Sequence, residues 1–180
     1  MLKPLIIILL WLGSACAVLG VPRIVINEIY YDPEPKTDPV EFIELYNAGT
    51  TSANMAGWRF TSGVDYTFPA GTFLEAGQYL VIAAAPAAIN TRFGFVPLGP
   101  WSGSLSNDGE RIRLVNAANL VEDEVDYGVG FPWPTGSLDS GKSIELVNSA
   151  LDNDLGGHWR AGGDTAGTGN TLIGIESDWK

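Results

Sequence analysis

The feature that most constrains the fold is a series of short apolar runs, each ended by turn-forming residues. Residues 24–31 are rich in β-branched and aromatic side chains and stop at an Asp-Pro pair. Residues 41–47 alternate, with Ile43 and Leu45 on one face and Phe42 and Glu44 on the other. Such runs at regular spacing, with no sustained helical period, predict an all-β, immunoglobulin-like sandwich of about eight short strands.

The remaining expected strands are residues 58–61, 66–68, 79–83, 111–115, 125–127 and 143–147. The uninterrupted apolar run 79–83 predicts a central strand, and we expect Trp58 in the core. Residues 86–93 begin with proline and precede Gly94, which predicts one short helix. The acidic run 122–124 predicts a solvated hairpin tip.

The N-terminus has the order of a signal peptide. One lysine precedes an apolar run, and Ala15 and Ala17 supply the small-x-small pattern that signal peptidase accepts. We expect cleavage after Ala17, with Gly20 as a second end, and a secreted, extracellular or cell-surface protein, or a periplasmic one. An uncleaved anchor is the alternative, although glycine and serine dilute the roughly 20 apolar residues that a spanning helix needs.

Cleavage would also remove Cys16, the only cysteine, so the mature protein would have no disulfide and would depend on core burial. The expected organisation is a signal peptide at 1–17, a sandwich domain at 18–161 and a Gly/Thr-rich linker and tail at 162–180. The tail is either a last edge strand or the start of a further segment. No membrane span is expected after cleavage.

The charge balance is acidic, with 21 acidic residues against 10 basic ones and a formal net charge of −11. Nucleic-acid binding draws much of its affinity from clustered cations that displace counterions from phosphates. The basic residues are scattered here, so nucleic acids and anionic membranes are poor partners. Proteins, glycans and cations remain open.

Several local strings occur together in one order. They are residues 26–29, 41–47, 56–58, 77–82, 105–110, 125–127 and 159–160. In this order they resemble a lamin-tail domain of the bacterial, secreted kind, over about residues 21–161. The resemblance implies an immunoglobulin-like β-sandwich used for binding or surface architecture, often joined to enzymes. It does not imply a nuclear role, because no coiled-coil heptads precede the domain.

Glu28, Glu41 and Glu44 offer the most tempting catalytic carboxylates, because a glycosidase needs two that face one cleft. The alternative, which we favour, is that they are solvent-facing strand residues or satisfy backbone groups. His158 is the only histidine, and no nucleophile motif accompanies it. We therefore expect no enzyme.

Two loops carry oxygen ligands of the type that calcium takes. They contain Asp32, Glu34 and Asp38, and Asp152, Asn153 and Asp154, respectively. Neither follows the spacing of a calcium-binding loop, so we expect no cofactor, with calcium as the alternative.

Trp101, Trp133 and Trp159 lie in segments rich in glycine and proline. Such residues either stack on a sugar or anchor a partner protein, or else plug the end of the core. The sequence thus predicts an exported, non-enzymatic binding or structural module that recognises a protein or glycan. The alternative is an accessory domain of a secreted enzyme, a hydrolase or nuclease, with its catalytic part elsewhere. Ligand and oligomeric state are left open.

Overall fold

Eleven strands form three antiparallel sheets in residues 20–135 and 141–162, the part of the chain that the computed structural model describes. The five-stranded sheet has the order β11 (Trp159–Ala161), β10 (Ile144–Leu146), β1 (Ile24–Tyr30), β2 (Phe42–Asn47) and β7 (Tyr79–Ala83). The four-stranded sheet has the order β5 (Tyr66–Thr67), β4 (Arg59–Ser62), β8 (Gly109–Val115) and β9 (Val121–Gly128). Strands β3 (Ala53–Asn54) and β6 (Phe73–Leu74) form a small pair.

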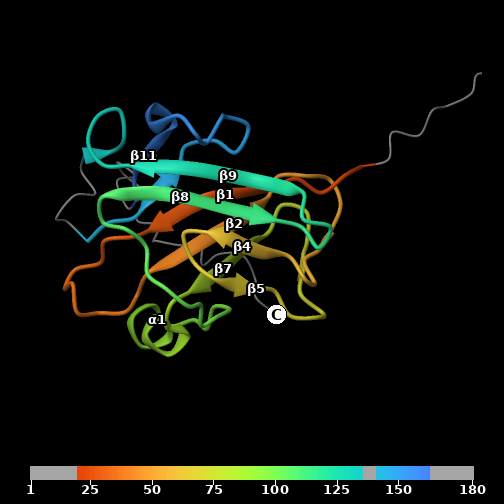
Figure 1. Ribbon diagram of the computed structural model, residues 1–180, viewed down its shortest axis with the longest axis horizontal. Coiled ribbons are helices and arrows are strands. Elements are labelled where there is room, and N and C mark those ends of the chain that lie inside the picture. The colour runs from red at the N-terminus through yellow and green to blue at the C-terminus, as the bar shows by residue number, and fades with distance from the viewer. Residues whose placement is uncertain (1–19, 136–140, 163–180) are drawn as a thin grey trace, which may run out of the picture.

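The two larger sheets form the expected immunoglobulin-like β-sandwich, so the fold prediction is confirmed. In Figure 1 the ribbons of β8 and β9 overlie those of β1 and β2. Strands β1 and β9 belong to different sheets and are far apart in the sequence, but they are in contact. The core between them takes the inward residues of alternating strands, such as Ile43 and Leu45 from β2 and Ile112 and Leu114 from β8. Trp58 belongs to this core, as expected.

Strand β7 is not a central strand, because it lies at the edge of the five-stranded sheet. Its apolar run has a different cause. Residue Leu98 runs beside it, donating its N–H to the Val81 carbonyl and accepting from the Ala83 N–H, both at 2.9 Å. Helix α1 (Pro86–Phe93) packs on its outer face, where Ile89 joins Val81 and Ala83 in a second apolar cluster. Strand β7 is therefore covered by the main core on one face and by α1 on the other, and Leu98 pairs with part of its edge.

Helix α1 occupies the expected residues. Proline stands in its first turn, and Gly94 ends it in the left-handed conformation with φ of 84°. The acidic run 122–124, however, is not a hairpin tip, because it lies within β9. The turn between β8 and β9 is formed by residues 116–120, where the Asn116 N–H donates to the Leu120 carbonyl. Three short strands, β3, β6 and β11, were not expected.

A β-bulge interrupts the pairing of β1 with β2 between Ile26 and Glu28. The extra residue, Asn27, shifts the register by one position. As a result Glu28 lies directly opposite Glu44 of β2, and also opposite Glu145 of β10. A 3-10 turn, η2 (Gly156–His158), leads into β11. The predicted signal peptide and cleavage residues Ala15 and Ala17, and nearly all of the predicted linker and tail, lie outside the described residues.

Candidate functional site

A pocket of about 280 Å³ opens at the end of the sandwich where β1 ends and β2 begins. The β1–β2 loop, residues 32–41, forms one wall, and residues 103–107 before β8 form the other. Three carboxylates line it, those of Asp32, Asp38 and Glu41. The pocket is concave, its lining is part polar and part apolar, and acidic side chains outnumber basic ones there.

The charges of this pocket are partly paired within the loop. The ammonium of Lys36 forms ion pairs with Asp32 and, at 3.3 Å, with Glu34. The Asp38 carboxylate accepts from Arg92 of α1 at 3.1 Å. The Leu105 N–H donates to Glu41 Oε2 at 3.0 Å, and burial raises the pKa of Glu41. The loop is thus braced against α1 and against the opposite wall.

The same contacts bear on the calcium alternative. Lys36 already supplies a cation beside Asp32 and Glu34, and Arg92 supplies one beside Asp38. Within residues 20–135 and 141–162, no group of three or more His, Cys, Asp or Glu side chains is arranged to hold a metal ion. Calcium binding stays a prediction to be tested by melting experiments.

The second loop expected to offer calcium ligands is instead a connector. The Asp154 carboxylate accepts from the Asp126 N–H of β9 at 2.8 Å. Asn153 is buried and donates from Nδ2 to Asp123 Oδ2 at 2.7 Å, and the backbone carbonyl of Asp152 contacts His158 Nδ1 at 2.7 Å. These bonds tie residues 152–154 to β9 and to the turn before β11.

The glutamates considered as catalytic residues are separated by the structure. Glu28 and Glu44 lie side by side but are only 4% and 3% exposed, so the expectation of solvent-facing residues is wrong for them. Glu41 lies apart from them, in the pocket. Glu41 accepts from the Leu105 N–H, which agrees with the expectation of a group that satisfies the backbone. Glu44 accepts from Asn27 Nδ2 at 2.9 Å, and Glu28 accepts from the Ser143 hydroxyl. Buried in this way, the pair does not form the open cleft that a glycosidase needs.

The three loop tryptophans have different environments. Trp101 and Trp159 are 7% and 5% exposed and belong to the main core. Their rings plug the core and present no open face to a ligand. Trp133 is half-buried, with its ring centroid 5.8 Å from that of Trp159. Ligand contact by Trp133 stays a prediction.

Sequence patterns did not reveal Asp123, whose carboxylate joins three segments. Asp123 Oδ2 accepts from the Ile26 N–H at 2.6 Å and from Asn153 Nδ2 at 2.7 Å. The bulge in β1 accompanies this contact, because the Ile26 N–H lies where the β1–β2 register shifts. Burial raises the pKa of Asp123 to about 6. An acidic run in a sequence does not indicate that one of its side chains contacts a strand of the other sheet.

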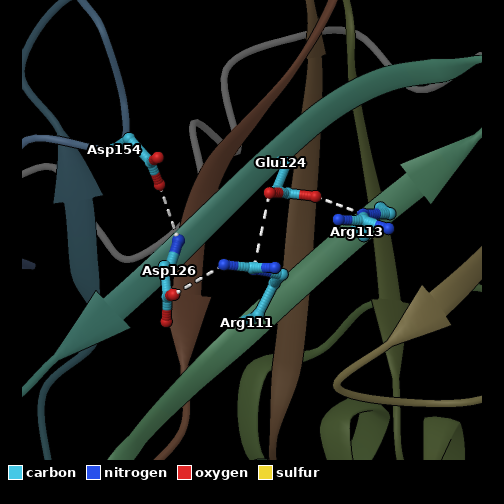
Figure 2. A network of polar contacts seen from close by, with 5 residues as sticks. All are labelled: Arg111, Arg113, Glu124, Asp126 and Asp154. Atoms are coloured by element: carbon cyan, nitrogen blue, oxygen red, sulfur yellow. Dashed lines mark hydrogen bonds and ion pairs between the residues drawn. The ribbon is translucent and has the colours of Figure 1, made fainter.

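Charged side chains also form a ladder on the outer face of β8 and β9 (Figure 2). Arg111 lies between Glu124 and Asp126, with nitrogen–oxygen distances of 3.4 and 3.1 Å. Arg113 pairs with the other oxygen of Glu124. These cross-strand pairs follow from the register, in which Arg111 faces Asp126 and Arg113 faces Glu124. The arginines are therefore neutralised in place and do not form a free basic patch.

Comparison with known proteins defines the family. A model of the lamin tail domain matches residues 20–129, more than half of the chain. The chain belongs to the lamin tail domain family. The match ends before β10 and β11, yet these strands complete the five-stranded sheet of this lamin tail domain. A search of curated proteins found no match. None of the helices in the described residues has the length and apolar character needed to cross a membrane.

Proposed function

We propose that this lamin tail domain acts outside the cytosol as a non-enzymatic binding or structural module. The pocket between residues 32–41 and 103–107 is the observation that carries the proposal. Loops at one end of a rigid sandwich are common binding positions, because they vary while the scaffold holds them. The pocket is held by strands β1, β2 and β8 and by the brace from Arg92.

The charge of the pocket favours a protein partner over a neutral glycan. Its lining includes Asp32, Asp38 and Glu41, in a chain of net charge −11. Lys36 pairs with Asp32 and Arg92 with Asp38, whereas Glu41 accepts from the backbone N–H of Leu105 and forms no ion pair among the described residues. A lysine or arginine side chain of a partner would complement this lining, and attraction between opposite charges speeds encounter. We propose that such a side chain enters the pocket.

Affinity capture with paired baits tests this proposal. The wild-type domain and the double variant Asp38→Asn, Glu41→Gln are used to capture partners from extracellular extracts at low and high salt. The expected partner is lost with the variant and weakened by salt. A matched control, Asp65→Asn with Glu75→Gln, removes the same charge from exposed positions and retains the partner. Equal capture by all three baits would contradict the pocket assignment.

Export is tested separately, by N-terminal sequencing of protein recovered from the medium or cell envelope. The Ala15-Cys16-Ala17 string supports a start at Val18. A start at Met1 would contradict cleavage and favour a retained anchor.

A further inference from the structure

Three glutamates form a row across three neighbouring strands of the five-stranded sheet. Glu28 of β1 lies directly opposite Glu145 of β10 on one side and Glu44 of β2 on the other. Their sequence neighbours Ile29, Ile43 and Ile144 point into the main core, so the glutamates share the opposite face. Side chains directly opposite each other lie close enough to interact, and like charges in such positions destabilise a sheet.

Within residues 20–135 and 141–162, one basic side chain forms an ion pair with a member of the row, and it does so at the β11 end. Arg160 of β11 pairs with Glu145 at 2.9 Å. Glu28 and Glu44, both almost fully buried, are bonded only to neutral groups among their described hydrogen bonds, the Ser143 hydroxyl and the Asn27 amide. Two adjacent buried carboxylates without a cation are costly to ionise together. One of them therefore keeps a proton under conditions where an exposed glutamate has lost it.

We propose that Glu28 and Glu44 share one proton, and that loss of this proton opens the junction between β1 and β10. This junction has the fewest paired residues of any strand junction in the five-stranded sheet. Strand β10 meets β1 at only two residue pairs, Glu28 with Glu145 and Ile29 with Ile144. By contrast, six residue pairs join β1 to β2. Separating β10 from β1 leaves Glu28 beside Glu44 but removes Glu145 and Ser143 from Glu28 and admits water to it, and solvation lowers the cost of the second charge.

The remaining groups near the row do not supply the missing charge. Arg160 is already paired with Glu145. On the β7 side, Tyr79 lies near Glu44, and burial raises the pKa of Tyr79, so it stays neutral where the glutamates titrate. Burial, and after it the Glu44 carboxyl, raise the pKa of Glu28 to about 8, and burial raises that of Glu44 to about 7. The junction is closed below this range and opens as pH rises through it.

Hydrogen exchange on the full mature protein tests the proposal between pH 5.5 and pH 9, with rates corrected for intrinsic exchange. The expected result is that protection of the β10 amides falls about tenfold or more from pH 6 to pH 9, a fold-change set by roughly one pKa unit per tenfold. Protection in β8 and β9, which follows the global stability, falls less than that of β10. Glu28→Gln keeps a partner for Ser143 without ionising, and removes the pH dependence.

The control variant is Glu122→Gln, which makes the same change at an exposed position of β9 and leaves the wild-type behaviour intact. Glu44→Gln removes the other carboxyl of the pair. If Glu28→Gln does not fold, Glu44→Gln replaces it and is likewise expected to remove the pH dependence. A fall that persists in the glutamine variants would overturn the proposal. So would an equal loss of protection in β8, β9 and β10, because that would show global unfolding without a separate opening of the β1–β10 junction.

Discussion

At the scale of single residues, Asp123 connects the most distant parts of the chain. It lies in β9, and its Oδ2 accepts from Ile26 of β1 and from Asn153 of the loop before β11. The Ile26 N–H and the Asn153 side chain are buried, so neither donor has ready access to water. One side chain thereby links an edge strand of the four-stranded sheet to the middle strand of the five-stranded sheet and to the loop before β11.

We predict that Asp123→Ala lowers the free energy of unfolding by about 2 kcal/mol at pH 5. Each buried donor that is left without an acceptor costs roughly 1–3 kcal/mol, and relaxation of the surrounding structure recovers part of this cost. The pKa of Asp123 is raised to about 6, so its contribution falls as pH rises through the range between its unfolded value and 6. The loss at pH 7.5 is therefore about 1 kcal/mol smaller.

Urea unfolding at the two pH values measures both numbers. Glu122→Ala, at the exposed neighbouring position, is the control and changes stability by less than about 0.5 kcal/mol. An Asp123→Ala loss that is the same at pH 5 and pH 7.5 would show that the carboxyl does not titrate as described.

The calcium alternative is also decided by individual residues. Because Lys36 pairs with Asp32 and Glu34, and Arg92 with Asp38, we expect that calcium finds no site with enough free carboxylate. Thermal melting with calcium and then with chelator is expected to give the same Tm. A rise of several degrees that the chelator reverses would establish a calcium site and reopen both loops.

At the scale of elements, the β8–β9 hairpin depends on a glycine where β8 begins. Gly109 has φ of 94°, and a Cβ there would lie 2.5 Å from the Tyr127 carbonyl oxygen. Gly71 has φ of 84° with nothing within 4 Å of a Cβ, so it isolates the cost of the backbone conformation alone.

We predict that Gly71→Ala costs about 1 kcal/mol, the usual cost of a left-handed L-residue. Gly109→Ala costs roughly 3 kcal/mol, because the clash with Tyr127 adds to that strain. Urea midpoints of the two variants give the difference. Equal losses would mean that the hairpin shifts easily and that its close approach at Tyr127 is not structurally important.

Several elements could be predicted from sequence because their information is local. The alternation in residues 42–47 and the proline-to-glycine frame of α1 each lie within one segment. Strands β3 and β11 have only two and three residues, too few for a period to show. The run 122–124 was wrongly predicted to be a hairpin turn because it is acidic. The turn is formed instead by the segment that contains Asn116 and Asn119.

The candidate sites were predictable only in part for the same reason. Asp32 and Asp38 are close in sequence, so their shared loop was visible, but the wall from residues 103–107 was not. The contact of Glu28 with Glu44 depends on strand order and on the bulge at Asn27. Neither is encoded in the local pattern. Burial of Trp101 and Trp159 likewise depends on which strands cover them.

At the scale of the whole molecule, stability rests on the core between the two sheets. Cys16 is the only cysteine and lies outside the described residues, so the described sandwich holds no disulfide. The same sandwich places carboxyls in settings that favour the protonated form, with pKa values of about 8 for Glu28, 7 for Glu44 and 6 for Asp123. These shifts all have the same sign, so their effects on folding add.

We predict that the free energy of unfolding falls as pH rises from 5 to 8.5. In this range the unfolded chain has released these protons while the native state still holds some of them. Each retained proton makes stability fall by about 1.4 kcal/mol per pH unit, until pH passes the native pKa of its carboxyl. The expected loss is roughly 8 kcal/mol or less in total, most of it from Glu28 and Glu44, and the protein is most stable near pH 5.

Glu28→Gln with Glu44→Gln should flatten the profile between pH 6 and pH 8, where this pair titrates, and leave the Asp123 part below pH 6. Repulsion from the net charge of −11 acts in the same direction, so the control must remove equal charge. Glu75→Gln with Glu122→Gln does so at exposed positions and should keep the slope. Chemical denaturation across the pH range measures the free energy of unfolding of both double variants. If the control variant flattens the pH profile as much as the variant of the buried pair, the effect comes from net charge and not from the buried pair.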